Sequence, residues 1–287
     1  MTFPNETMRL LNERGSCRAF VDDPIPPDVL RQVIEAGLHA PTGGNLQPYS
    51  IIQIERTETR QWLRERCGQG FIENAPASLL FCLDFRRLKR WAELRDAPFT
   101  ATRSFRHFWI SFQDTLICAQ NICTAADVMG LGSVYIGTVL EFFDELRDRL
   151  ALPDGVFPVV LLCLGYPRTA PKVQPKLGID IVVHVEQYRD LSDQDLLAAF
   201  EAKYSSRRVE STEERLEALA ETCRAVSGDD LAARAVGTAR RDGYINAAQR
   251  YFGLHYRASE MPKGNARYLA QMEASGFKWF TPYEGDE

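Results

Sequence analysis

Two short segments near the start of the chain combine residue types that could bind a flat, phosphorylated ligand. Residues 14–18 read Arg-Gly-Ser-Cys-Arg, so that two guanidinium groups and one hydroxyl could together hold a phosphate. Residues 40–48 read Ala-Pro-Thr-Gly-Gly-Asn-Leu-Gln-Pro, a turn in which glycines let bare backbone approach a flat ligand while Asn45 and Gln47 offer amides. The first segment alone favours a solvated turn. The order of motifs along the chain is therefore needed to distinguish a phosphate-binding segment from a solvated turn.

A third segment, residues 130–137, reads Gly-Leu-Gly-Ser-Val-Tyr-Ile-Gly and follows a long apolar stretch. Its glycines superficially match a dinucleotide-binding fingerprint, in which a glycine-rich turn lies after a strand and opens a helix. Tyr135 stands where the third glycine of that fingerprint belongs, and the segment ends a predicted helix instead of opening one. These departures exclude a Rossmann-type site.

Further motifs follow at residues 163–167 (Cys-Leu-Gly-Tyr-Pro), at residues 174–177 (Gln-Pro-Lys-Leu) and in the strand-like residues 181–185 (Ile-Val-Val-His-Val). In this order the motifs resemble those of the FMN-dependent nitroreductase and flavin reductase superfamily, and most of all its NADPH-preferring, oxygen-insensitive branch. The resemblance covers about residues 8–204. It implies an α+β fold, a nitroreductase-like sandwich in which helices cover a central mixed β-sheet, assembled as an intertwined homodimer.

The resemblance also implies which residues bind FMN. The first motif corresponds to residues that hold the flavin phosphate and the pyrimidine end of the ring, where a fixed cation such as Arg18 stabilises the negative charge of the reduced flavin. Residues 41–45 correspond to a segment that crosses from one subunit to cover the flavin bound largely by the other. The implied cofactor-binding residues are Arg14, Ser16, Arg18, Pro41, Thr42, Gly43, Asn45, Gln69, Tyr135, Ile136, Gly137, Gln174 and Lys176.

Two of these assignments concern the sugar chain and the reactive end of the flavin. Gln69 resembles a glutamine that contacts the ribityl chain, and a plain loop is an equal alternative for it. Residues 135–137 resemble the loop whose backbone N–H faces flavin N5, the atom that accepts hydride. Arg207 and Arg208 lie in a tract that resembles the NADPH-contacting basic segment of the branch, with a solvated charge pair as the alternative.

The chain departs from the family pattern at two positions near the expected phosphate. Gln174 and Lys176 stand where the family usually has a Lys-x-Arg pair, so only Lys176 keeps a positive charge. Gly15 stands where the family often has Arg. Each departure removes one possible phosphate contact.

The elements that must position these motifs alternate between helix and strand. Helices are expected at residues 5–13, from Pro27 to the break at Pro41, and at residues 57–67, and buried strands at residues 50–54, 77–83 and 159–164. The dominant helix is expected at residues 111–129, opened by a capping box of Ser111 and Asp114. Because this helix is apolar on nearly every face, it must be buried, which favours a dimer.

The C-terminal part has a different composition. Helices are expected from the cap at residues 211–214 to Gly228 and again at residues 229–241. Because large aliphatic residues are few there, this part should pack on the main domain. The expected domains are residues 1–204, which bind FMN, and a helical extension at residues 205–287.

Bulk properties exclude several other classes. The chain has 287 residues, a net charge of -5 and a pI of about 5.6, which disfavours nucleic acid and acidic membranes as partners. No apolar run is long enough to span a membrane and no signal peptide is evident, so we expect a cytoplasmic protein. The seven cysteines are scattered without a Cys-x-x-Cys pattern and the four histidines lie far apart, so we expect reduced thiols and no metal.

The interpretation that these observations favour is a homodimeric FMN oxidoreductase. NADPH would reduce flavin N5 and leave, and an electron-poor acceptor such as a nitroaromatic, a quinone or a free flavin would then take two electrons. The alternatives are flavin-dependent dehydrogenation or biosynthetic chemistry on the same fold, and a flavin-free binding or regulatory protein. The stretch from Trp91 to Trp109 and the long C-terminal extension could serve a dedicated substrate.

Overall fold

The computed structural model of the chain describes residues 2–283, which fall into two compact units. Unit 1 holds the described residues up to Val173 and those from Arg267 onward, and unit 2 runs from Gln174 to Ala266. After unit 2, the chain from Arg267 onward therefore returns to the unit in which it began. The boundary that we expected near residue 204 separates an FMN-binding domain from a C-terminal extension, and it stays a prediction.

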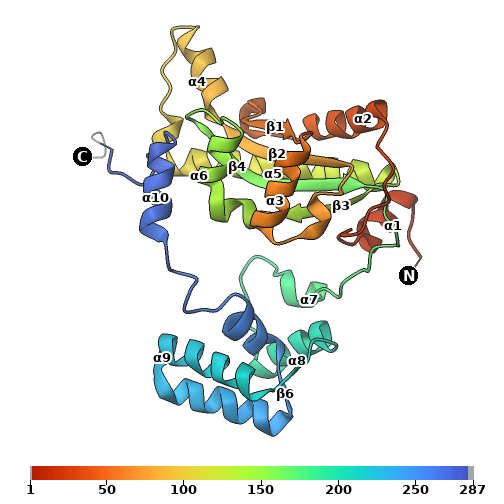
Figure 1. Cartoon of the computed structure of the whole chain (residues 1–287), viewed down its shortest axis with the longest axis vertical. Coiled ribbons are helices and arrows are strands. Elements are labelled where there is room, and N and C mark those ends of the chain that lie inside the picture. The colour runs from red at the N-terminus through yellow and green to blue at the C-terminus, as the bar shows by residue number, and fades with distance from the viewer. Residues whose placement is uncertain (1, 284–287) are drawn as a thin grey trace. The chain divides into compact units, whose positions relative to one another are not determined.

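Unit 1 is built on a four-stranded sheet that runs through its middle (Figure 1). The strands are β1 (Tyr49–Gln53), β2 (Ala77–Asp84), β3 (Gly132–Ile136) and β4 (Val156–Gly165), in the order β1-β2-β4-β3. The three strands that we expected from apolar runs are confirmed, and β3 was missed because its glycine and serine break the apolar pattern. All neighbouring strands pair antiparallel, where we expected a mixed sheet.

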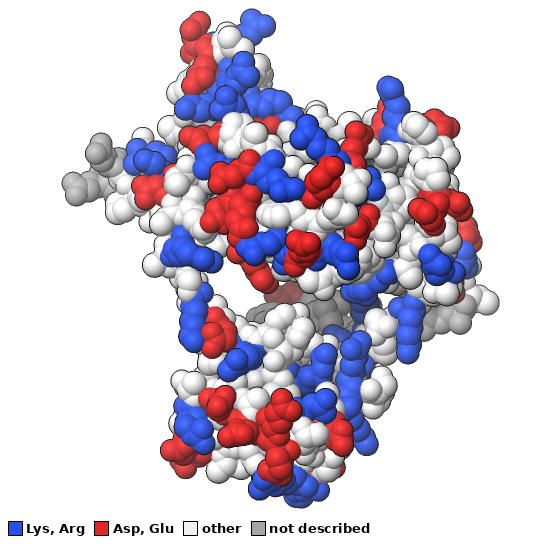
Figure 2. Space-filling model, in the orientation of Figure 1, with Lys and Arg blue, Asp and Glu red and all other residues white. Residues whose placement is uncertain are grey.

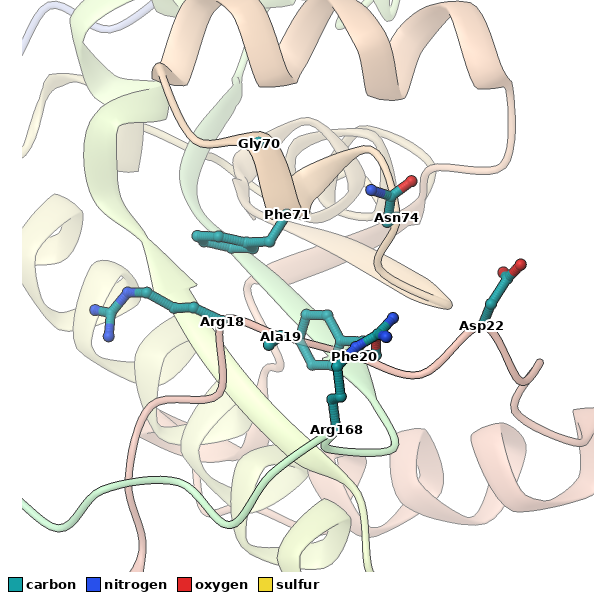
Figure 3. Close-up of a pocket in the computed structure, with 8 residues that line it drawn as sticks. All are labelled: Arg18, Ala19, Phe20, Asp22, Gly70, Phe71, Asn74 and Arg168. Atoms are coloured by element: carbon teal, nitrogen blue, oxygen red, sulfur yellow. The ribbon is translucent and has the colours of Figure 1, made fainter.

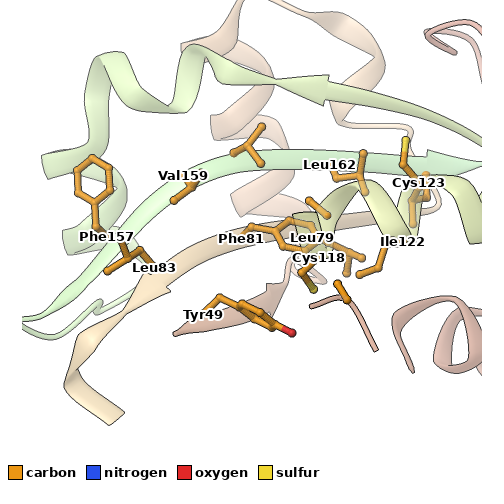
Figure 4. Close-up of a cluster of buried hydrophobic side chains, with 14 of the residues drawn as sticks. Tyr49, Leu79, Phe81, Leu83, Cys118, Ile122, Cys123, Phe157, Val159 and Leu162 are labelled. Carbon is orange, nitrogen blue, oxygen red and sulfur yellow. The ribbon is translucent and has the colours of Figure 1, made fainter. Parts of the chain in front are cut away.

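Both faces of this sheet are buried, as the apolar runs predict. Alternate residues of β2 enter different clusters: Leu79, Phe81 and Leu83 join one, while Leu80 and Cys82 join the other. The first cluster lies under α2 (Pro27–Leu38) and α5 (Phe105–Val128), and Figure 4 shows part of it. The second lies under α3 (Thr57–Cys67) and α6 (Phe143–Arg149). The expected α+β sandwich of helices on both faces of a sheet is confirmed.

The long helix α5 begins earlier than we expected. Its N-cap is Ser104, whose side chain accepts from the His107 backbone N–H, so the capping box predicted at Ser111 and Asp114 is wrong. The helix continues to Val128 through apolar residues that the pattern did identify. The extra turns bring Phe108 into the core, where its ring lies 5.7 Å from the Phe157 ring. Burial of Phe108 therefore favours a helix that begins before Ser111, the residue that we expected to cap it.

The remaining elements of unit 1 are short. They are α1 (Glu6–Glu13), α4 (Phe85–Glu93), most of α10 (Asn265–Ala274) and the 3-10 turns η1 (Gly43–Asn45), η2 (Gly70–Ile72), η3 (Ala101–Arg103) and η4 (Gly137–Phe142). No helix within residues 2–283 is long and apolar enough to cross a membrane.

Unit 2 is mainly helical. It contains α7 (Ile179–Val182), α8 (Asp193–Tyr204), β5 (Val209–Glu210), α9 (Glu213–Asp242), β6 (Tyr244–Ile245) and a π-helical turn at η5 (Gln249–His255). α9 is two helices joined at Ser227 and Gly228, and Gly228 has φ of 79°, which confirms the expected break at this glycine. The strand expected at residues 181–185 is wrong, because Ile181 and Val182 end the short helix α7 and residues 183–185 form no strand.

Candidate functional site

A cavity of about 490 Å³ in unit 1 brings Arg18 next to the turn that follows α3 (Figure 3). Its lining is Arg18, Ala19, Phe20, Asp22, Gly70, Phe71, Asn74 and Arg168. In Figure 3 the Phe71 ring lies above the backbone of residues 18–20, and the Arg18 side chain extends to the side opposite Asn74 and Asp22. Gln69, which we expected to contact a ribityl chain, directly precedes this lining. No motif pointed to Arg168, which the fold brings to this cavity from a distant part of the chain.

The first motif lies alongside β3. Ser16 forms an isolated parallel bridge with Ser133, and the Cys17 backbone N–H donates to the Ser133 carbonyl at 2.9 Å. The approach is so close that a Cβ on Gly132 would lie 2.6 Å from Cys17 Cβ. The fold therefore places Ser16 two residues along β3 from Tyr135, the start of another predicted site segment.

Arg14 enters the same region from the motif's first position. Its Nη2 donates to Ser133 Oγ at 3.2 Å, and its Nε lies 3.6 Å from Asp127 Oδ2. Nε is buried and has no hydrogen-bond partner among the described residues. Burial raises the pKa of Asp127, although the Arg14 guanidinium opposes that shift. Asp127 and Ser133 therefore hold the Arg14 guanidinium in place, and the side chain, 26% exposed, can still meet an anionic or carbonyl acceptor.

The departure at Gly15 has a structural reason. A Cβ at this position would lie 2.7 Å from the backbone oxygen of Lys172, so the segment that leaves β4 packs directly on the glycine. An arginine here, as the family often has, would require that segment to move. Gly15 thus reflects packing against residue 172 and is compatible with a cradle formed by Arg14 and Arg18.

The end of β3 leaves backbone open to a ligand. A Cβ on Gly137 would meet no atom within 4 Å, and Ile136 before it is fully buried. The Tyr135 hydroxyl donates to Gln120 Oε1 at 3.4 Å, and burial raises the pKa of Tyr135. Tyr135 is therefore a neutral phenol at physiological pH.

The segment at residues 41–47 is held by α5 and by its own turns. The Gly43 backbone N–H donates to Asp114 Oδ2 at 3.1 Å, and the Gln47 N–H donates to Thr42 Oγ1 at 3.1 Å. Asn45 and Gln47 have φ of 55° and 46°, a left-handed conformation that is uncommon outside glycine. No hydrogen bond or ion pair among residues 2–283 joins this segment, from Pro41 onward, to Arg14 or Arg18.

Two residues that the sequence did not identify secure this segment. Asp114, which we took for a helix cap, is the acceptor for Gly43; burial raises its pKa and the Gly43 bond opposes the shift. Arg87 donates from Nη2 to the backbone oxygens of Gln47 at 2.7 Å and Tyr49 at 2.6 Å. Neither belongs to a recognisable motif, because each acts on backbone from a distant element.

The last four predicted site residues belong to unit 2. Arg207 Nη2 donates to Gln174 Oε1 at 3.1 Å, and the Arg208 guanidinium lies 4.5 Å from the centre of the Tyr244 ring. Lys176 lines a cavity of about 570 Å³ together with Arg189, Asp195 and Lys203. Their roles stay predictions.

Comparison with known proteins places this geometry in a family. The model of the nitroreductase family matches residues 11–166, and the chain belongs to that family. It is 33% identical over 207 residues to the NADPH-flavin oxidoreductase of Vibrio harveyi, covering 71% of this chain and 84% of the relative. It is 33% identical over 196 residues to the oxygen-insensitive NADPH nitroreductase of Salmonella typhimurium, covering 68% and 79%. The solved structure of Bacillus megaterium NfrA2 matches with a TM-score of 0.74 at 27% identity, covering 96% of this chain and 99% of that one.

Proposed function

We propose that the protein is an FMN-dependent NAD(P)H oxidoreductase that reduces electron-poor acceptors. The observation that carries the proposal is that Arg18 lines a cavity of unit 1, while the partly exposed Arg14 of the same motif is held in place by Ser133 and Asp127. A flavin phosphate and the ring carbonyls are acceptors that such donors fit. The names of the relatives from Vibrio harveyi and Salmonella typhimurium support a reduced nicotinamide as donor and a flavin as cofactor.

The chemistry that FMN would supply is the acceptance of a hydride at N5 and its transfer onward to a second substrate. Arg14, Ser16 and Arg18 would hold the phosphate and the pyrimidine end of the ring, with Lys176 as a further phosphate contact. Gln69 would contact the ribityl chain. The backbone of residues 135–137 would face N5, where the absence of a side chain on Gly137 keeps the approach open.

Donor and acceptor would use the same face in turn, which gives a ping-pong order. The protein supplies position and a fixed positive charge, and no side-chain nucleophile is required. Burial raises the pKa of Cys17 and of Cys123, so both stay thiols at neutral pH. Tyr135 likewise stays protonated and could donate only as a neutral hydroxyl.

A homodimer would complete the site. Along α5, the side chains of Phe105, Trp109 and Ile117 are 55%, 44% and 41% exposed, an apolar face that favours a partner copy. In that assembly, Pro41, Thr42, Gly43 and Asn45 of one copy would cover the flavin held by the other. This accounts for the absence, among the described residues of one chain, of a hydrogen bond or ion pair between residues 41–47 and Arg14 or Arg18.

Three finer assignments belong to the same proposal. Arg207 and Arg208 would read the 2′-phosphate of NADPH. Residues 1–204 would form the FMN-binding domain, and residues 205–287 the helical extension. The cell compartment would be the cytoplasm, where seven free thiols remain reduced.

An absorbance spectrum tests the central claim. The purified protein, supplemented with FMN and freed of excess, should show flavin bands, and NADPH should bleach them without oxygen. The rate of NADPH oxidation should then increase when a nitroaromatic, a quinone or free flavin is added. The compound that gives the highest rate identifies the class of acceptor. A colourless protein that does not retain added FMN would overturn the proposal in favour of a flavin-free binding protein.

A further inference from the structure

A second cavity of unit 1, of about 560 Å³, lies between the start of α4 and the loop that leads into β4. It shares no lining residue with the cavity of Arg18. One wall consists of the cationic residues Arg86, Arg87 and Arg90 with Trp91, and the other consists of residues 150–153 of the loop. Its volume is that of a small-molecule site. We call it the α4 cleft.

The cations of the α4 cleft differ in how they are compensated. Arg87 is fixed by the carbonyls of Gln47 and Tyr49 and lies 3.9 Å from Asp84. Among the described residues, Asp84 is the only acidic one in the lining, and it also accepts from the Ser50 hydroxyl at 2.5 Å and from the Arg87 backbone N–H at 2.9 Å. This carboxylate is therefore held by Ser50 and Arg87, and it makes no ion pair with Arg86 or Arg90.

Arg86 and Arg90 have no hydrogen bond, ion pair or ring contact from their side chains to any residue of the described chain. They are four residues apart on one helix, so their like charges are neighbours and repel each other. The whole chain carries a net charge of -5, yet Figure 2 shows Lys and Arg gathered over α4. An uncompensated pair of guanidinium groups at the wall of a cleft is an anion-binding arrangement, because each can bind a carboxylate or phosphate through two N–H groups.

Trp91 adds an aromatic surface to the same wall. The side chain is 58% exposed, and Leu94, one turn further along, is 78% exposed. The opposite wall offers the apolar residues Leu150, Leu152 and Pro153. A flat ring inserted between Trp91 and this loop would be covered on both faces, while its acidic group met Arg86 and Arg90.

We propose that the α4 cleft binds a flat aromatic molecule that carries a carboxylate or a phosphate. The site is separate from the flavin cavity and does not depend on the function proposed above. Both charge and ring are needed, since neither the exposed arginines nor the exposed Trp91 alone would select such a ligand. Carboxylate and phosphate share the chemistry that two guanidinium groups recognise, and the test separates them.

Isothermal titration calorimetry of the full-length protein tests this, on the FMN-free protein and on protein loaded with FMN and then freed of excess, because free FMN is itself a flat aromatic phosphate and would compete for the α4 cleft. The probes are 2-naphthoate, 2-naphthyl phosphate, the neutral 2-naphthalenemethanol and inorganic phosphate, at low ionic strength because the contact is screened by salt. At least one of the two aromatic anions should bind at least about tenfold tighter than both the alcohol and inorganic phosphate, with or without FMN. Whichever of 2-naphthoate and 2-naphthyl phosphate binds more tightly identifies the acidic group that the cleft prefers.

Variants locate the binding. The double variant Arg86→Met/Arg90→Met should weaken the preferred anion by about tenfold or more and leave the alcohol unchanged. Trp91→Leu should weaken the anion and the alcohol alike. Arg95→Met is the matched control, because Arg95 follows the same helix, its side chain has no partner among the described residues, and it lies outside the α4 cleft.

Three results would overturn the inference. Anions that bind no tighter than the alcohol, or no tighter than inorganic phosphate, would show that charge and ring do not act together. Binding that is seen only without FMN would place the probe in the flavin cavity. Equal binding by the double variant and the native protein would place the probe outside the α4 cleft. The melting temperature of the double variant should be unchanged, since neither side chain has a partner among the described residues, and this shows that its fold is intact.

Discussion

The Asp114 carboxylate of α5 accepts a hydrogen bond from the backbone N–H of Gly43 at 3.1 Å, 71 residues away in the chain. The bond fixes the start of the segment that would cover the flavin to the most buried helix of unit 1. Burial raises the pKa of Asp114 above its ordinary 3.8, while the Gly43 N–H opposes the shift. Ionisation of Asp114 is therefore less favourable in the folded protein than in the unfolded chain, and its contribution to the free energy of unfolding depends on pH.

Replacing Asp114 by Asn should remove that pH dependence. A carboxyl whose pKa is raised on folding favours the folded state most below its unfolded pKa, and this contribution is lost as pH rises through the folded value. The amide keeps an acceptor for Gly43 and carries no charge. The free energy of unfolding of Asp114→Asn, relative to the native protein, should therefore rise from pH 4 to pH 7. Urea unfolding across this range measures it, and a difference independent of pH would contradict the argument.

Arg87 should be required to hold the other end of the same segment. Arg87→Met removes the bonds to the carbonyls of Gln47 and Tyr49, and we expect a loss of about 1–2 kcal/mol in stability because the side chain is half exposed. FMN should dissociate faster, since Gln47 is held in a left-handed conformation that relaxes when released. Arg86→Met is the control, because its guanidinium has no partner in the described chain. Equal melting temperatures and FMN release rates for the two variants would show that the contact is dispensable.

These two contacts also mark the limit of what the sequence could predict. Apolar runs identified β1, β2 and β4, and α3 was predicted at its observed bounds, because burial on both faces leaves a strong one-dimensional signal. β3 was missed, since its packing against residues 16–17 demands small residues that do not look like a strand. The strand predicted at residues 181–185 failed for the opposite reason, as β-branched residues there do not form a ladder.

The candidate site divides in the same way. The motifs of residues 14–18 and 41–48 were visible because they are contiguous. Asp114, Arg87 and Arg168 were invisible in that role, because each acts on backbone or a cavity formed by residues far away in the chain. Single-sequence patterns report local conformation, whereas these contacts depend on how α4 and α5 pack on the sheet.

Arg18 should contribute a charged contact to FMN. Arg18→Ala should weaken FMN binding by roughly tenfold to a hundredfold, the equivalent of about 1.5–3 kcal/mol for a hydrogen bond to a charged group. Fluorescence titration of the apoprotein with FMN measures it. Arg56→Ala should leave the dissociation constant unchanged, because Arg56 is exposed, lies outside the cavity and has no side-chain partner among the described residues. Similar affinities for both variants would remove Arg18 from the cofactor site.

The exposed face of α5 should be an interface between two copies. Obligate interfaces of this kind bury more than about 2,000 Å², and one buried charge within them is strongly unfavourable. Ile117→Glu should therefore shift the protein from dimer to monomer or aggregate in sedimentation velocity runs and lower its FMN content. Leu94→Glu, a substitution of a 78% exposed leucine on another element, should remain dimeric. A native protein that sediments as a folded, FMN-loaded monomer at low micromolar concentration would refute the dimer.

Arg207 and Arg208 should determine the preference for NADPH over NADH. NADPH differs from NADH by one phosphate, which a guanidinium can bind through two N–H groups. Arg207 donates to Gln174 and Arg208 lies over the Tyr244 ring, so both guanidinium groups are oriented by neutral partners and keep their charge for a ligand.

Changing both arginines to Ala should raise the apparent KM for NADPH and leave that for NADH nearly unchanged. Because the contact is exposed and screened, we expect an effect of about 1–2 kcal/mol that shrinks at high salt. The kcat with saturating donor should barely change, since binding is lost equally from ground state and transition state. Steady-state kinetics with both donors at two ionic strengths measure this. A double variant that keeps the native NADPH/NADH ratio would show that the pair is solvated charge, and Arg103 and Arg106 would be the next candidates for reading the phosphate.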